Sequence, residues 1–143
     1  MLFRSLSATR GPATFPVPLR LRVLVVDDNR DSVERLARLL QLHGHQVQTA
    51  SDGVEAVQAA AAFRPNLVLL DIGLPKMNGY EAARRIRHHD WGKRMVLVAM
   101  TGWGQDEDKR RALEAGFDHH MTKPVDPVAL EKLVAVLTLR KRG

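Results

Sequence analysis

The sequence LVLLD, residues Leu67–Asp71, consists of four apolar residues followed directly by a carboxylate. An apolar run without polar alternation is typical of a strand buried on both faces of a parallel sheet. Further runs are also followed directly by a polar or charged residue: 23–26 by Asp27 and Asp28, 96–100 by Thr101, and a weaker run, 119–122, by Lys123. Segments with helical periodicity separate the runs. This order of strand and helix predicts a parallel sheet with helices on both faces.

The residues that follow these runs offer carboxylates, a hydroxyl and an amine. In parallel α/β sheets, ligands bind outside the carboxyl ends of the strands. We therefore expect one functional site at this edge, formed by Asp27, Asp28, Asp71, Thr101 and Lys123.

Five pairs of a strand and a helix are expected along the chain. The predicted strands are 21–26, 46–50, 66–70, 95–100 and 118–121. Strand 66–70 is expected at the centre, whereas the polar strand 46–50 is expected near an edge. The first helix has Asp31 or Ser32 as its expected cap and Gly44 as its stop. The other helices are predicted at 54–63, 80–88 and 107–115, and from about Pro127 onward.

Composition limits the classes of protein. A chain of 143 residues suits one domain, and the lack of cysteine excludes disulfides and thiolate metal sites. No apolar run approaches the roughly 20 residues that cross a bilayer, so we expect a soluble, cytoplasmic protein that does not bind membranes. The net charge is +6, but seven of the 22 basic residues lie near the chain ends. The remaining 15 face 16 acidic residues, so we expect no direct binding of nucleic acid.

The first 19 residues differ in composition from the rest of the chain. They mix Ser, Thr, Gly and Pro with scattered Arg, show no periodicity, and predict a disordered basic leader. Their acid-free opening resembles a mitochondrial presequence, but it is short and broken by prolines. Residues 20–140 are expected to form the domain, and 141–143 a basic tail.

Asp27, Asp28 and Asp71 are the residues from which chemistry is expected. Three carboxylates placed this close repel one another unless a cation lies among them. A hard divalent ion with oxygen ligands resolves the repulsion, and Mg²⁺ suits a site that also holds a phosphoryl group. An isolated Asp27–Asp28 pair would instead be read as a helix cap with a solvated neighbour.

Asp71 is expected to present its carboxylate, exposed at the rim, for in-line attack on phosphorus. Lys123 can neutralise charge on the transferred oxygens, Thr101 can donate a hydrogen bond to one of them, and backbone donors can complete the cradle. Each residue alone has a structural explanation, as a turn, a cap or a solvated amine. Their joint placement at successive strand ends favours phosphoryl chemistry.

The spacing and residue types from about Leu21 to Leu139 resemble the receiver domain of bacterial two-component response regulators. The resemblance implies a flavodoxin-like, doubly wound sheet of five parallel strands with five helices. It also implies that Asp27 and Asp28 bind Mg²⁺, that a histidine kinase or phosphotransfer protein phosphorylates Asp71, and that the carbonyl of Gly73 ligates the metal. Pro75 and Gly79 match the family's loop, and the Lys123–Pro124 bond is expected to be cis.

One position departs from the family's pattern. His120 stands where most receivers carry Tyr or Phe, so the usual aromatic switching is in doubt. The segment 116–127 is most similar to receivers of hybrid sensor kinases. The chain is expected to be either a single-domain regulator, which the initial Met and the leader favour, or a part of a larger protein. The resemblance implies a downstream protein partner on the face of helix 107–115, strand 118–121 and the last helix. It leaves a homodimer open.

Two other functions are alternatives to that of a receiver. A phosphatase of the haloacid dehalogenase type needs a second Asp two residues after its nucleophile, where this chain has Gly73. A pseudo-receiver that serves only as an adaptor would not need an intact acidic pocket. The resemblance therefore favours a signalling module that catalyses only its own phosphorylation and dephosphorylation.

Two further groups of residues are better explained structurally. The adjacent pairs His88–His89 and His119–His120 lack the i, i+4 spacing of two metal ligands on one helix. Arg84, Arg85 and Arg87 are expected to form a solvated face of the third helix.

Overall fold

The computed structural model describes residues 20–102 and 106–142. Five strands alternate with five α-helices and one short 3₁₀-helix: β1 (Arg22–Val26), α1 (Arg30–Leu42), β2 (Gln46–Ala50), α2 (Gly53–Phe63), β3 (Leu67–Asp71), α3 (Gly79–His88), η1 (Asp90–Gly92), β4 (Val96–Thr101), α4 (Asp106–Ala115), β5 (His119–Thr122) and α5 (Pro127–Arg142). The predicted leader, 1–19, lies outside the described residues.

The strands form one parallel sheet in the order β2-β1-β3-β4-β5. The predicted fold class is confirmed, as are the central position of β3 and the edge position of β2. β1 lies directly beside β3, with Val26 paired to Leu70. The chain positions that follow these two residues are therefore neighbours at one edge of the sheet.

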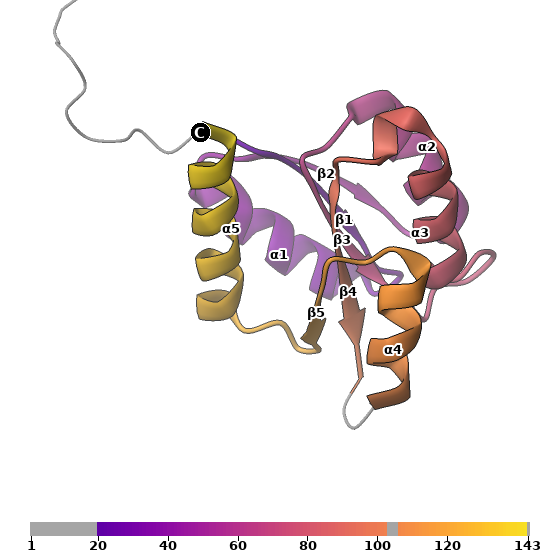
Figure 1. Cartoon of the computed structure of the whole chain (residues 1–143). Helices are drawn as coiled ribbons and strands as arrows, with labels where there is room; N and C mark the ends of the chain where they lie inside the picture. Colours follow the sequence, from indigo (N-terminus) through magenta and orange to yellow (C-terminus); the bar gives the residue numbers. More distant parts are fainter. Residues whose placement is uncertain (1–19, 103–105, 143) are drawn as a thin grey trace, which may run out of the picture.

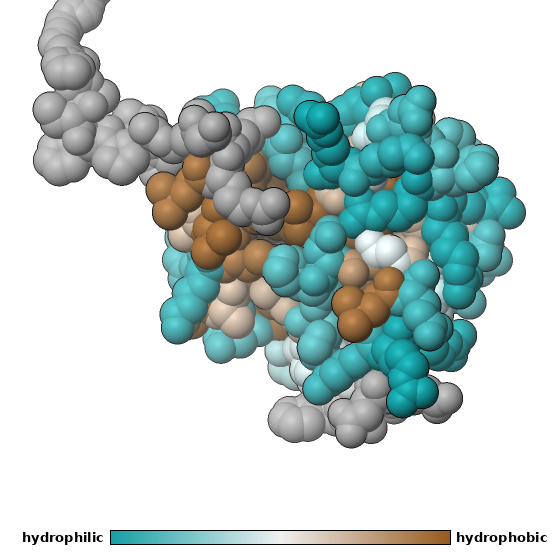
Figure 2. Space-filling view, in the orientation of Figure 1, coloured by the Kyte–Doolittle hydropathy of each residue, from teal (hydrophilic) through white to brown (hydrophobic). Residues whose placement is uncertain are grey.

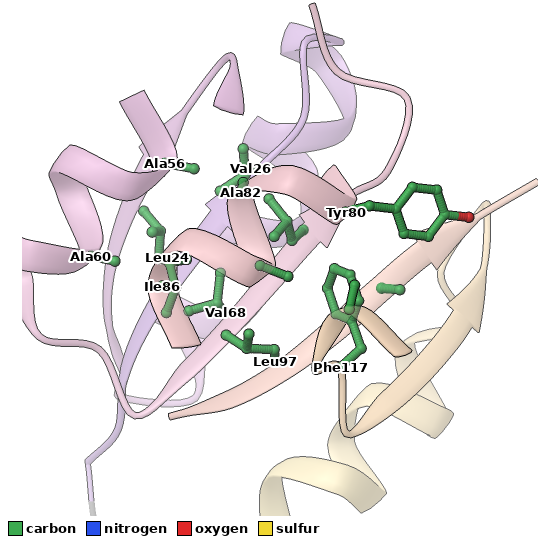
Figure 3. Close-up of a cluster of buried hydrophobic side chains, with 14 of the residues drawn as sticks. Leu24, Val26, Ala56, Ala60, Val68, Tyr80, Ala82, Ile86, Leu97 and Phe117 are labelled. Carbon is green, nitrogen blue, oxygen red and sulfur yellow. The ribbon is translucent and has the colours of Figure 1, made fainter. Parts of the chain in front are cut away.

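Two hydrophobic clusters sandwich the sheet, and alternate residues of each buried strand supply them. Leu24 and Val68 point toward α2, α3 and α4, where Ala60, Ile86 and Phe117 complete the first cluster (Figure 3). The odd-numbered residues of β1 and β3 point the other way. They pack against α1 and α5, which cover the opposite face (Figure 1): Val23, Val25, Leu67 and Leu69 with Leu36, Leu40, Leu130 and Val134.

The cap of α1 differs from the sequence-based expectation. The predicted cap was Asp31 or Ser32, but the Asn29 side chain accepts a hydrogen bond from the Ser32 N–H at 3.1 Å. Helix α1 therefore begins at Arg30, and Asp31 lies in its first turn, where its charge favours the positive end of the helix dipole. Gly44 follows the helix with φ +91°, as a stop residue requires.

Arg87 was predicted to lie on a solvated face, and this was wrong. Its guanidinium donates hydrogen bonds to the carbonyls of Gly92, Met95 and Gly116, and it pairs with Asp118 at 2.7 Å. Asp118 in turn accepts from the backbone N–H of Leu97. Arg87 thus ties α3 to the segment that precedes β4 and to the more distant segment that precedes β5. No helix in the described part of the chain is long and apolar enough to cross a membrane.

Candidate functional site

The three predicted carboxylates lie together at the carboxyl edge of the sheet. Asp27 and Asp28 directly follow β1, and Asp71 is the last residue of the neighbouring β3. One oxygen from each carboxylate lies within 4.8 Å of the others. The pairing of β1 with β3 therefore produces the acidic cluster, as the sequence predicts.

Two of these acids are buried. Asp27 is 2% exposed and Asp71 is 6% exposed, whereas Asp28 is exposed. The prediction that the Asp71 carboxylate is exposed at the rim was wrong. The β3–α3 loop folds back over the strand end, where the Gly79 N–H donates to the carbonyl of Ile72. The cluster is open to water at the exposed Asp28.

Backbone donors orient the buried carboxylates. The N–H of Asn29 donates to Oδ1 of Asp27, and the N–H of Gly73 donates to Oδ1 of Asp71, each at 3.0 Å. In both cases the donor lies two residues after the acid, in the loop that leaves the strand. Each Oδ2 atom is left to face the centre of the cluster.

Lys123 completes the pocket from the other side. Its Nζ lies 3.0 Å from Oδ2 of Asp71 and 3.4 Å from Oδ2 of Asp27. The lysine follows β5, and its backbone N–H donates to the carbonyl of Thr101 at 2.7 Å. The Lys123–Pro124 bond is cis, as the resemblance implies. The Lys123 side chain, which is one-third exposed, thus reaches two buried carboxylates.

Thr101 and Gly73 occupy the remaining predicted positions. Thr101 ends β4 and is 3% exposed, and it is joined to the pocket through its backbone bond with Lys123. Gly73 contacts Asp71 through its N–H. His120 is exposed on β5, paired with Ala99.

The loop between β3 and α3 depends on residues that the sequence reading did not assign to the site. A Cβ on Gly79 would lie 2.5 Å from the carbonyl oxygen of Asp71, so only glycine allows this close approach. Lys76 adopts a left-handed backbone, φ +67°, and its Nζ lies 3.4 Å from the buried carboxylate of Asp52. These contacts hold the loop against α2. A left-handed backbone at a residue other than glycine cannot be recognised from the sequence, so the role of Lys76 was not predicted.

The electrostatics of the pocket are dominated by burial and crowding of negative charge. Burial raises the pKa of Asp27, and the nearby charge of Asp71 adds to this, against the opposing effects of Asn29 and Lys123. For Lys123, burial alone would lower the pKa, but the hydrogen bond and charge of Asp71, with Asp27, raise it overall. Lys123 contacts two of the three carboxylates, and its single positive charge does not balance the cluster, so the pocket favours a further cation.

The donor set fits a hard divalent ion. Three carboxylate oxygens that lie within 4.8 Å of one another can share one small ion, and Mg²⁺ prefers oxygen ligands. The pocket keeps an open side at Asp28, so a metal here could retain water or accept phosphoryl oxygens. This geometry suits phosphoryl transfer to a carboxylate held at the metal.

Comparison with known proteins agrees with the fold and the pocket. The family model for the response regulator receiver domain matches residues 23–135, and the chain belongs to this family. It is 36% identical over 117 residues to the response regulator MprA of Mycobacterium ulcerans. The alignment covers 82% of this chain and 48% of MprA, so the chain spans about half the length of that relative.

Two solved structures are similar to the chain. The receiver domain of the sensor histidine kinase PA1611 from Pseudomonas aeruginosa, with a magnesium ion coordinated in its active site cleft, is 28% identical, with a TM-score of 0.77. That match covers 84% of this chain and 98% of the other. A chain from the co-crystal structure of the Saccharomyces cerevisiae phosphotransfer protein Ypd1 and the receiver domain of Ssk1 has a TM-score of 0.81 and 29% identity. It covers 88% of this chain and 94% of the other.

Proposed function

We propose that this chain accepts a phosphoryl group on Asp71 from a histidine kinase or a phosphotransfer protein. The observation that carries the proposal is the position of Lys123, whose Nζ lies 3.0 Å from Oδ2 of Asp71, within a cluster of three carboxylates. Asp71 is the member of the cluster that is both buried on the central strand and in contact with Lys123 at hydrogen-bond distance.

The proposed reaction transfers phosphorus from nitrogen to oxygen. A carboxylate oxygen of Asp71 attacks the phosphorus of a phosphohistidine in line, an O–P bond forms, and the P–N bond to the donor imidazole breaks. The leaving imidazole takes up a proton from water. With acetyl phosphate as donor, acetate leaves instead. The product is an aspartyl phosphate.

The residues around Asp71 have distinct proposed roles. Asp27, Asp28, Asp71 and the carbonyl of Gly73 would hold Mg²⁺, which neutralises phosphoryl charge when bound. The ammonium group of Lys123 would move from the free carboxylate to the transferred oxygens. The Thr101 hydroxyl would donate to one of these oxygens, and this bond would link phosphorylation to the end of β4.

We also propose how the chain acts in a pathway. As a receiver it catalyses only its own phosphorylation and dephosphorylation, in the cytoplasm. A downstream protein would read its state on the α4–β5–α5 face. Leu113 of α4 and Val128 of α5 are 68% and 55% exposed there, and they are available for an apolar contact.

Labelling by a small phosphodonor tests this function. In the presence of Mg²⁺ and acetyl phosphate, the wild-type chain should gain one phosphoryl group, detected by intact mass or by phosphate-affinity electrophoresis. Asp71→Asn should abolish labelling, because an amide is not a nucleophile toward phosphorus. Asp90→Asn makes the same chemical change at a fully exposed side chain and should label normally. Full labelling of a folded Asp71→Asn variant would refute the proposal.

A further inference from the structure

A groove runs between α1 and α5, on the side of the sheet away from α3. It encloses about 380 Å³ and is lined mainly by apolar side chains: Leu39, Leu40, Leu130, Val134 and Ala135, with His43, His45, Glu131 and Thr138. The proposed phosphorylation uses none of these residues. A polar contact between Nε2 of His43 and Oε1 of Glu131, at 3.4 Å, crosses from one helix to the other.

The described chain begins beside this groove. Leu21 is buried in the same cluster as Leu40 and Leu130, and its N–H donates to Nδ1 of His45 at 3.1 Å. Leu21 also lines a neighbouring hollow together with Leu137 of α5. The residues that precede Leu21 therefore start from one end of the groove.

Exposed apolar side chains lie near the ends of both helices. Leu139 of α5, four residues after Ala135, is 61% exposed, and Leu42 at the end of α1 is 76% exposed. Figure 2 shows hydrophobic residues gathered around the C-terminal half of α5. An exposed apolar patch that continues into a groove is typical of a surface that is covered in the working molecule.

The sequence immediately before Arg20 is FPVPL, residues 15–19, which is apolar and carries no charge. Its two prolines favour an extended polyproline conformation, so ordering it costs less entropy than ordering an unrestricted chain. Five extended residues span about 17 Å. The stretch of α5 from Leu130 to Thr138 is about 12 Å long. The segment is thus long enough to follow the groove.

We propose that residues 15–19 dock in the groove between α1 and α5, with Phe15 and Val17 as the apolar anchors. A segment joined to Arg20 has an effective concentration in the millimolar range at this groove, far above that of a second copy of the chain. The charged part of the leader, with Arg4 and Arg10, lies further back and takes no part. The domain would therefore begin before Arg20.

Charge introduced into the segment tests the docking in the full chain. Val17→Asp should shift the NMR methyl signals of Leu130 and Val134 and lower the melting temperature by about 4 °C. Leu2→Asp makes the same kind of change outside the proposed segment, and it should alter neither measurement. If the methyl spectra of Val17→Asp and of the wild type are identical, the proposal is wrong.

A variant on the groove side separates docking from an indirect effect. Ala135 is exposed, so Ala135→Asp should fold while it places a charge in the groove. If the segment docks there, Val17→Asp should add little to the effect of Ala135→Asp, whereas additive effects would refute direct contact.

Measurements at several protein concentrations show whether the groove is occupied by the segment of the same chain or by a second copy of the chain. Wild-type methyl shifts at Leu130 and Val134 should be independent of protein concentration. Shifts that change with concentration would overturn the proposal in favour of a dimer on this face. The measurements need neither Mg²⁺ nor a phosphodonor, so their failure would leave the proposed phosphorylation of Asp71 unaffected.

Discussion

At the residue scale, the hydrogen-bond partner of a buried titratable side chain determines which protonation state the folded protein favours. His45 is 8% exposed, and its Nδ1 accepts a hydrogen bond from the N–H of Leu21. A protonated Nδ1 would be a donor facing another donor. Burial, and to a smaller extent the nearby His43, lower the pKa of His45. The folded protein therefore requires the neutral ring.

This gives a pH dependence with a definite sign. Because the pKa of His45 in the folded state lies below its ordinary value of 6.5, its stabilising bond is fully present above that value. The contribution falls as the pH drops below 6.5 and through the lowered pKa, up to a loss of about 1 kcal/mol. Urea unfolding at several pH values should show this loss.

His45→Asn is the matched variant, because its Oδ1 can accept from Leu21 without titrating. The difference in unfolding free energy between wild type and His45→Asn should change between neutral and mildly acidic pH. A difference that stays constant would show that His45 does not titrate with folding.

At the element scale, strand positions were predictable and the loops that close the site were not. Apolar runs define β1, β3 and β4 to within a residue, because a strand buried on both faces tolerates few polar side chains. The burial of Asp71 depends on the loop before α3, whose path is determined by contacts with α2. Arg87 was misread because its partners Gly116 and Asp118 are 29 and 31 residues away in sequence.

Glycine in the β3–α3 loop provides a test at this scale. Gly79→Ala would place a methyl group 2.5 Å from the carbonyl oxygen of Asp71, so the loop must move. We expect a loss of about 1–3 kcal/mol of stability, measured by urea unfolding, despite the higher helix propensity of alanine. The shift would also displace Asp71 and weaken Mg²⁺ binding.

Gly73→Ala is the control in the same loop. Its methyl group would lie 3.8 Å from Oδ1 of Asp71, an ordinary contact. This variant should keep stability close to that of the wild type. If Gly73→Ala and Gly79→Ala lose the same amount of stability, the close contact between position 79 and the carbonyl of Asp71 is not the reason for glycine at that position.

At the scale of the whole molecule, folding brings three carboxylates and one lysine into a single pocket. Folding adds to the repulsion because it brings Asp71 to Asp27 and Asp28, from which it is distant in an unfolded chain. An ion that binds only the folded state stabilises it by about 1.4 kcal/mol at ten times its dissociation constant. Mg²⁺ should therefore raise the melting temperature of the full chain.

Removal of the acids should remove this response. Asp28→Ala, at the exposed member of the cluster, should lose most of the Mg²⁺-dependent increase, and Asp31→Ala on α1 should keep it. If the double variant Asp27→Asn, Asp28→Ala still responds fully to Mg²⁺, the ion binds at another place on the molecule.

The sequence alone predicted the sheet and the membership of the acidic cluster, because both follow from the order of apolar runs and the residues after them. It did not predict the burial of the cluster or the roles of Asn29 and Lys76. Those depend on which backbone N–H groups and loop residues the tertiary structure brings within reach.

The central claim, that Asp71 is the phosphorylated residue, is tested most directly by chemical mapping. Borohydride reduces an aspartyl phosphate to homoserine, so treatment after reaction with acetyl phosphate and Mg²⁺ marks the modified position. Peptide mass spectrometry should find homoserine at position 71 and leave Asp27 and Asp28 as aspartate. Homoserine at position 27 or 28, or reduction that does not require Mg²⁺ and phosphodonor, would contradict the account.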